Sequence, residues 1–214
     1  MGRARSSASR SLIRVPRVLA FDTATSLVSC CLWRDGDVLA ERRSAEPRAA
    51  QRVLALVEEL LAESGVRRDE IDTVGVGTGP GSFTGLRIGI ATARGLALGL
   101  GVPLGGTGTL DALLAGCAGA TAVIDARRGE VFVAGPGREP GVITPAALAA
   151  VLRPGEVLVG DGAVRHREAF AGASIAPDLS PLHAPSAATI AERAGQLQPV
   201  DAVYLRRPDA EPVA

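Results

Sequence analysis

Hydrophobic and polar positions alternate along the first half of the chain in a way that predicts three strands, a helix, a strand, a helix and a strand. Five strands are expected: one that begins at residue 18, three at 27–33, 38–41 and 74–77, and one that begins after residues 102–104. Two helices are expected at 47–65 and 82–99. Asp35-Gly36 lies between the second and third strands and is typical of a tight hairpin. The first half is therefore predicted to begin with an antiparallel hairpin sheet and to continue with strands joined by helices.

The second half repeats this beginning in a shorter form. A buried strand at 122–125 ends in Asp125, a turn follows at 127–129, and a strand returns at 131–133. Further elements are expected as a helix at 145–152, a strand and turn at 157–162, and a helix at 186–195. The first strand of the first half also ends in an aspartate, Asp22. We expect Asp22 and Asp125 to face each other across a cleft, where open α/β sheets bind ligands.

One stretch, residues 74–99, has an unusual content of glycine. Its loop Thr78-Gly-Pro-Gly-Ser82 is followed by a helix that Ser82 or Thr84 caps. Small residues recur along that helix at Gly85, Gly89, Ala93 and Ala97. Since a glycine inside a helix costs about 1 kcal/mol relative to alanine, this stripe implies a close neighbour. Two interpretations remain open, namely tight packing on the chain's own sheet and a helix–helix contact with another subunit.

A glycine loop before a helix is also a common anion site, because exposed N–H groups and the helix dipole attract negative charge. The loop does not match the phosphate-binding Walker sequence, since no lysine follows its last glycine. It does not match the dinucleotide fingerprint or the nucleophile elbow, since Pro80 stands where the latter needs glycine. An anion site at this loop is therefore an open alternative.

Composition excludes several classes of protein. Acidic and basic residues balance at 23 each, so no net charge attracts nucleic acid or an anionic membrane. Three cysteines, two of them adjacent at Cys30-Cys31, form neither a disulfide framework nor a zinc spacing, and we expect a reducing, cytoplasmic location. No apolar run approaches the length of a membrane span. We divide the chain into a disordered tail at 1–16, an N-terminal lobe at 17–116 and a smaller C-terminal lobe at 117–214.

Four stretches together resemble the TsaB (YeaZ) family. They are Phe21-Asp-Thr-Ala-Thr25, Gly77-Thr-Gly-Pro-Gly-Ser-Phe-Thr-Gly-Leu-Arg-Ile-Gly89, Ile124-Asp-Ala-Arg-Arg-Gly-Glu-Val131 and Tyr204-Leu-Arg206. The resemblance implies an α/β fold of two tandem ribonuclease H-like units, the actin-like ATPase fold, each a mixed sheet led by an antiparallel hairpin with flanking helices. This agrees with the two units that the hydrophobic pattern predicts.

The same resemblance implies a function without catalysis by this chain. In that family the paralogue TsaD transfers threonylcarbamoyl to adenosine 37 of tRNAs that read codons beginning with A. TsaB pairs with TsaD through helices, and the ATPase TsaE joins them. The chain is thus expected to be a scaffold that activates a TsaD-like ligase, to form a homodimer when alone, to meet tRNA indirectly through the complex, and to have no membrane partner.

Site residues are carried over from the family as expectations. The partner interface is assigned to Val53, Leu56, Val57 and Leu60 on the first helix and to Gly85, Leu86, Gly89, Ile90, Ala93 and Ala97 on the second. Nucleotide contacts are assigned to Asp22, Thr23, Thr25, Asp125 and Arg127, with a degraded phosphate site as the alternative. The chain is expected to hold no cofactor of its own. ATP or ADP is expected to bind, if at all, at the partner interface.

The sequence departs from the family at position 49. Relatives often carry a histidine there, similar to one in the metal-binding paralogue, whereas this chain has Ala49. His166 and His183 have no second histidine or cysteine at ligand spacing, so we expect no metal site. The alternative function is an ATP-hydrolysing or phosphoryl-transfer enzyme that uses Asp22 and Asp125 around Mg²⁺. A peptidase is the weakest alternative, since the sequence offers no nucleophile or metal constellation for one.

Overall fold

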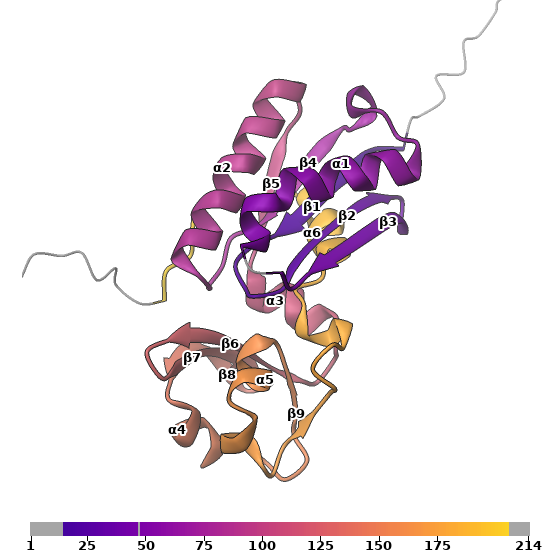
Figure 1. The fold of residues 1–214 in the computed structure, drawn as a ribbon. Coiled ribbons are helices and arrows are strands. Elements are labelled where there is room, and N and C mark those ends of the chain that lie inside the picture. The colour runs from indigo at the N-terminus through magenta and orange to yellow at the C-terminus, as the bar shows by residue number, and fades with distance from the viewer. Residues whose placement is uncertain (1–14, 47, 206–214) are drawn as a thin grey trace, which may run out of the picture.

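The computed structural model describes residues 15–46 and 48–205 of the 214-residue chain. Most of the predicted tail at 1–16, together with Pro47 and Arg206, lies outside these residues. The described part forms two lobes, and helix α3 lies between them (Figure 1). None of its helices is long and apolar enough to cross a membrane.

Each lobe contains one five-stranded mixed sheet. The first sheet consists of β1 (Arg17–Asp22), β2 (Val28–Arg34), β3 (Asp37–Ser44), β4 (Thr73–Gly77) and β5 (Leu104–Thr107), in the order β3-β2-β1-β4-β5. The second consists of β6 (Thr121–Arg127), β7 (Glu130–Gly135), β8 (Arg138–Ile143), β9 (Val157–Val159) and β10 (Ser174–Ile175), in the order β10-β9-β6-β7-β8. Both have three antiparallel strands and two parallel ones, which confirms the predicted α/β architecture of two tandem units.

Six α-helices accompany these sheets in the described residues. They are α1 (Val53–Ser64), α2 (Phe83–Leu100), α3 (Thr109–Ala115), α4 (Pro145–Ala149), α5 (Asp161–Arg165) and α6 (Ala187–Ala194). Turn and cap residues set several of the boundaries. Asp35 and Gly36 both have positive φ in the predicted hairpin, Gly65 ends α1 in the left-handed region, and the Ser82 hydroxyl accepts a hydrogen bond from Gly85 N at the start of α2.

The first sheet is covered on both faces, and the burial pattern of β1 shows how. Leu19 and Phe21 point into the core under α1 and α2, whereas Val18 and Ala20 point to the opposite face, where α6 packs. Helix α6 contacts β1, β2, β4 and β5, and it also contacts α3. The division at residue 116 assigned this helix to the C-terminal lobe, so that boundary does not hold for α6, which returns to the N-terminal lobe.

Candidate functional site

Asp22 lies at the carboxyl end of β1 and is held entirely by neighbouring groups of the chain. Its Oδ1 accepts a hydrogen bond from Ala24 N at 2.7 Å, and its Oδ2 accepts one from the Thr109 hydroxyl at 2.7 Å. The same hydroxyl accepts from Gly79 N at 3.0 Å. Asp22 is 0% exposed, and a Cβ at Gly77 would collide with its carboxylate. The prediction that Asp22 faces a cleft is therefore wrong, because the loop and helix α3 enclose it.

This environment shifts the ionisation of Asp22. Burial raises the pKa of the carboxyl from its ordinary value of 3.8 to about 6, although the hydrogen bonds from Thr109 and Ala24 N lower it. The negative charge of Asp161 raises the pKa further. Asp22 is therefore a group whose charged form is disfavoured by its surroundings, and its oxygens are already engaged by donors of the chain.

The two threonines predicted as nucleotide contacts are engaged in the same way. The Thr23 hydroxyl donates to Gly85 O at 2.8 Å, which ties the loop after β1 to the first turn of α2. The Thr25 hydroxyl donates to Leu27 O at 2.9 Å. Both threonines are buried. They therefore stabilise the loop rather than present free hydroxyls to the cleft.

Asp125, at the corresponding position of the second lobe, is surrounded by basic side chains. Its Oδ2 lies 3.1 Å from an Arg127 guanidinium nitrogen and 3.2 Å from Arg165 Nε. Its Oδ1 accepts from Arg127 N at 3.0 Å, and His166 Nε2 lies 3.7 Å away. Arg127 has a positive φ in the turn that joins β6 to β7. The charge of Asp125 is thus compensated by two guanidinium groups.

Asp161, which sequence reasoning did not single out, links the two lobes. Its Oδ1 accepts a hydrogen bond from Asp125 N at 3.1 Å, and its Oδ2 accepts one from Ser26 N of the first lobe at 2.8 Å. The only signal in the sequence was the turn Gly160-Asp161-Gly162 directly after a strand. Its partner Ser26 is 135 positions away, which a local pattern does not reveal.

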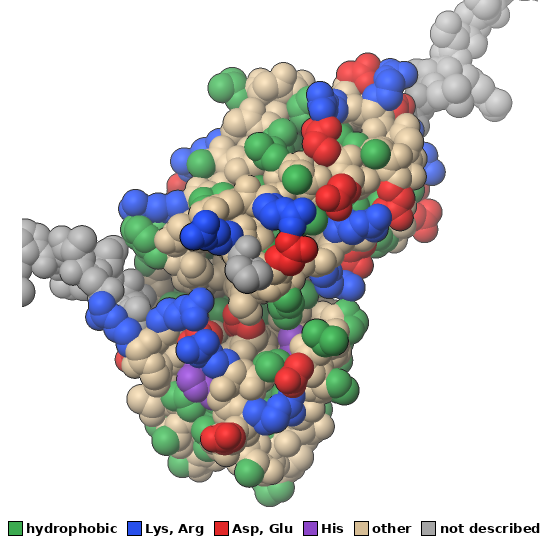
Figure 2. Space-filling view, in the orientation of Figure 1, with side chains coloured by type: hydrophobic (Ala, Val, Ile, Leu, Met, Phe, Trp, Pro, Cys, Tyr) green, Lys and Arg blue, Asp and Glu red, His purple; other side chains and the backbone are tan. Residues whose placement is uncertain are grey.

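A cavity of about 340 Å³ lies at this junction of the lobes. It is lined by Ser26, Leu27, Ala45, Asp125, Arg127, Asp161, Val164, Arg165, Asp178 and Leu179. Arginine side chains gather where the lobes meet (Figure 2). Of the five predicted nucleotide contacts, Asp125 and Arg127 line this cavity, whereas Asp22, Thr23 and Thr25 do not.

The residues predicted for the partner interface are buried within the chain itself. This holds for Val53, Leu56, Val57, Leu60, Gly85, Leu86, Gly89, Ile90, Ala93 and Ala97. A Cβ at Gly85 would collide with the carbonyl oxygen of Thr23, and one at Gly89 would collide with Thr23 Oγ1. The assignment of these residues to an interface is therefore wrong, and the stripe allows close approach of the loop after β1.

The opposite face of α2 is the exposed one. It carries Ala91, Gly95 and Gly99, and a Cβ at either glycine would have nothing within 4 Å. Leu98 on this face is 85% exposed, and Leu54 of the neighbouring helix α1 is 51% exposed. A second stripe of small residues, together with the exposed Leu98, thus faces solvent.

The loop before α2 is occupied by the chain's own backbone. Ser82 N donates to Ala24 O at 2.6 Å, and a Cβ at Gly81 would collide with the same carbonyl. The Gly79–Pro80 peptide bond is cis. The tight loop therefore serves the contact with residue 24, which accounts for the glycine at 81 without a bound anion.

The histidines have ordinary partners or neighbours. Gly160 N donates to His183 Nδ1 at 3.2 Å, and His183 Nε2 lies 3.2 Å from Ala176 O. His166 lies beside Asp125, as described above. Within residues 15–46 and 48–205, no three or more His, Cys, Asp or Glu side chains form a group that could hold a metal ion.

Comparison with protein families and relatives gives consistent matches. The family model for TsaD, tRNA N6-adenosine threonylcarbamoyltransferase, matches residues 43–180. An uncharacterized protein of Mycobacterium tuberculosis is 39% identical over 210 residues, which are 95% of this chain and 98% of that protein. The tRNA threonylcarbamoyladenosine biosynthesis protein TsaB of Escherichia coli is 44% identical over 145 residues, 64% of this chain and 63% of that protein.

A solved structure agrees with these sequence matches. The structure of YeaZ from Pseudomonas aeruginosa superposes with a TM-score of 0.69 at 27% identity. It covers 89% of this chain and 100% of its own. The similarity therefore extends over both lobes.

Proposed function

Because the chain belongs to the TsaB (YeaZ) family, we propose that it is a non-catalytic subunit that activates a TsaD-like ligase. It has a role in tRNA threonylcarbamoyladenosine biosynthesis, the process that the names of its relatives state. The reaction in question forms N6-threonylcarbamoyladenosine at position 37 of tRNAs. In this proposal the chemistry takes place on the partner.

The state of Asp22 supports a non-catalytic role. A carboxylate that holds Mg²⁺ or orients a phosphate must offer an oxygen lone pair to the ligand. Here Oδ1 and Oδ2 each accept a short hydrogen bond from the chain, and the residue is 0% exposed. Releasing either oxygen would leave the Thr109 hydroxyl or Ala24 N without its acceptor, at a cost of about 1–3 kcal/mol for each buried group.

The observation that carries the proposal is the exposed face of α2. A glycine inside an exposed helix costs about 1 kcal/mol relative to alanine. At Gly95 no neighbour within the chain lies close enough to exclude a side chain, so packing inside the chain does not explain this glycine. Together with Gly99 and Ala91 it leaves a flat surface on which another helix packs closely. Leu98, 85% exposed, adds an apolar side chain to the same surface.

We further propose which partners bind the chain and where they bind. A TsaD-like ligase binds the exposed faces of α1 and α2, and a second copy of this chain takes its place when the ligase is absent. A TsaE-like ATPase joins the pair, and tRNA meets the chain only through the complex. ATP or ADP in the complex meets Asp125 and Arg127, the predicted contacts that line the junction of the lobes. The location of this assembly is proposed as the cytoplasm.

Leu98→Asp is expected to weaken the association with the TsaD-like protein from the same source by about ten- to a hundredfold, because it places an unpaired charge in the contact. Titration calorimetry with the two purified proteins measures the change. tRNA modification by the reconstituted complex is expected to fall in parallel at limiting concentrations of the two proteins.

The matched control is Val151→Asp, which introduces the same charge at a 60% exposed position of the second lobe. It is expected to leave both the association and the modification unchanged. Equal thermal unfolding of both variants would show that neither has lost its fold. Full association of Leu98→Asp would overturn the proposed surface.

The enzyme alternative has a separate test. Purified protein alone is incubated with ATP and Mg²⁺, and the release of phosphate is followed for wild type and Asp22→Asn. We expect no turnover above the buffer blank. Magnesium-dependent turnover that Asp22→Asn abolishes would instead favour an ATP-hydrolysing or phosphoryl-transfer enzyme and would refute the non-catalytic role.

A further inference from the structure

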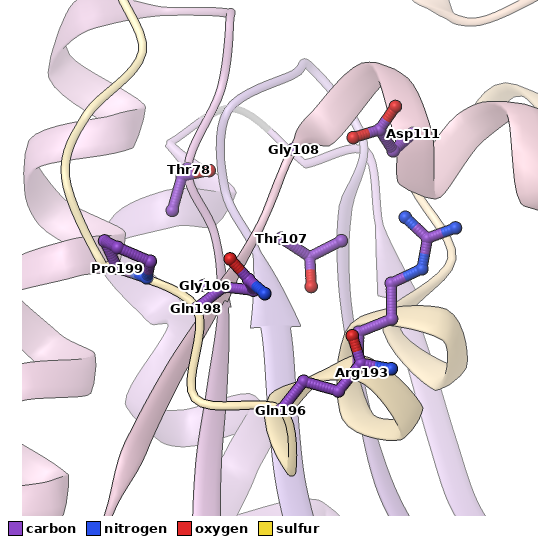
Figure 3. A pocket seen from close by; sticks show the side chains of 9 residues that line it. All are labelled: Thr78, Gly106, Thr107, Gly108, Asp111, Arg193, Gln196, Gln198 and Pro199. Atoms are coloured by element: carbon purple, nitrogen blue, oxygen red, sulfur yellow. The ribbon is translucent and has the colours of Figure 1, made fainter.

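A second cavity, of about 360 Å³, lies at the carboxyl ends of β4 and β5 and shares no lining residue with the cavity at the junction of the lobes. Its lining residues are Thr78, Gly106, Thr107, Gly108, Asp111, Arg193, Gln196, Gln198 and Pro199. They come from the residue after β4, from β5, the start of α3, the end of α6 and the segment that follows α6 (Figure 3). A cavity of this volume is at the small end of ligand sites in proteins.

Backbone contacts hold the walls of this cavity in place. Gly106 N donates to Gln198 O at 3.0 Å, and Thr78 N donates to Thr107 O at 2.9 Å. A Cβ at Gly106 would lie 2.6 Å from Pro199 O, so only glycine lets this segment approach β5 so closely. The segment that carries Gln196 and Gln198 is thus fixed against the sheet, and the cavity is preformed.

The polar groups around the cavity lack partners within the described part of the chain. Thr107 is 6% exposed, and its Oγ1 is buried without a hydrogen-bond partner. A buried hydroxyl in that state destabilises the protein unless something else satisfies it. Figure 3 shows the Thr107 side chain between Gln198 and Arg193. The buried hydroxyl therefore lies where a ligand or water in the cavity could satisfy it.

Opposite charges flank this hydroxyl. The guanidinium of Arg193 extends from α6 toward Asp111 at the start of α3 (Figure 3). Among residues 15–46 and 48–205, neither side chain forms an ion pair or side-chain hydrogen bond. The amides of Gln196 and Gln198 add both donors and acceptors to the same lining. A cation and an anion thus border one small polar cavity without neutralising each other.

We propose that this cavity binds a free α-amino acid. The carboxylate of the ligand pairs with Arg193, its ammonium group pairs with Asp111, and the Thr107 hydroxyl donates to the carboxylate. A simple anion would satisfy Arg193 but would lie near the negative charge of Asp111, and a simple cation would have the reverse problem. A zwitterion of amino-acid size satisfies both charges at once. This inference goes beyond the proposed function, since it requires no partner protein.

The test uses the full-length protein alone and titration calorimetry at low salt. The probes are glycine, L-serine, L-threonine and L-glutamine, each also as its N-acetyl derivative and its methyl ester. At least one free amino acid is expected to bind. Its two derivatives, each lacking one charge, are expected to bind about ten- to a hundredfold more weakly, the usual effect of losing a hydrogen bond to a charged group.

Arg193→Gln and Asp111→Asn are expected to weaken binding of that amino acid by the same factor. Glu192→Gln removes a charge from the neighbouring exposed position of α6 and is expected to leave binding unchanged. Absence of binding by every probe up to about 10 mM, a free energy near −3 kcal/mol, would overturn the proposal. So would equal binding of acetate or inorganic phosphate, or binding that neither variant weakens. Association with the TsaD-like protein is unaffected in each case, so the two proposals fail separately.

Discussion

Gly89→Leu is expected to lower the free energy of unfolding by about 3–5 kcal/mol. A side chain at this position of α2 would enter the space occupied by Thr23 Oγ1. If Thr23 turned away, its hydrogen bond to Gly85 O would break, and the buried Thr23 hydroxyl would lose its acceptor. Overpacking and the lost hydrogen bond therefore act together. Urea denaturation followed by circular dichroism measures the loss.

Gly95→Leu, six positions later on the same helix, is the matched control. Nothing lies within 4 Å of a Cβ at that position, so the substitution improves helix propensity by about 1 kcal/mol without a clash. We expect its midpoint of denaturation to stay level or rise, while association with the TsaD-like partner weakens. Wild-type stability of Gly89→Leu, or an unfolded Gly95→Leu, would contradict the assignment of inner and outer faces of α2.

Asp22 is expected to make the protein less stable as the pH rises from 4 to 7. The pKa of Asp22 is about 6 in the folded protein and 3.8 ordinarily, so the folded state holds the proton more tightly between these values. The free energy of unfolding therefore falls as the pH rises through this window, by about 3 kcal/mol in total. Above pH 6 the penalty is complete, and below pH 3.8 it is absent.

Comparison with Asp22→Asn isolates this contribution from those of other carboxyl groups. An asparagine keeps an oxygen acceptor for Ala24 N and offers its amide to Thr109, but it does not ionise. The stability of wild type minus that of Asp22→Asn is expected to fall by about 2–3 kcal/mol between pH 4 and pH 7. Asp35→Asn, in the exposed hairpin turn, is the same substitution at a surface position and controls for general effects of the replacement. A flat difference for Asp22 would contradict its shifted pKa.

Local patterns in the sequence were sufficient for most of the first lobe. The hairpin at Asp35-Gly36, the helix that ends at Gly65 and the cap at Ser82 follow from residues close to one another in the chain. The order of strands and helices in the first lobe followed from these local signals. Helix α3 and strand β8 were not predicted, because α3 lies in a segment rich in glycine and alanine and β8 contains Pro140 and Gly141, which read as breakers.

The inner face of α2 could not be predicted from the sequence. Gly85 and Gly89 on one side and Gly95 and Gly99 on the other give both sides the same small residues at helical spacing. The choice depends on Thr23, which lies 62 positions from its partner Gly85. Asp161 is a similar case, since it acquires its place in the site only when the two lobes come together.

The return of α6 to the first sheet has a consequence for the folding of this chain during its own translation. One face of the first sheet, which bears Val18, Ala20 and Cys31, packs against α6. During translation this face lacks that helix until residue 194 has left the ribosome. The N-terminal lobe consequently completes last, after the lobe encoded in the middle of the gene. A fragment ending at residue 116 would expose this apolar surface to water, because the cut separates the sheet from the helix that shields it.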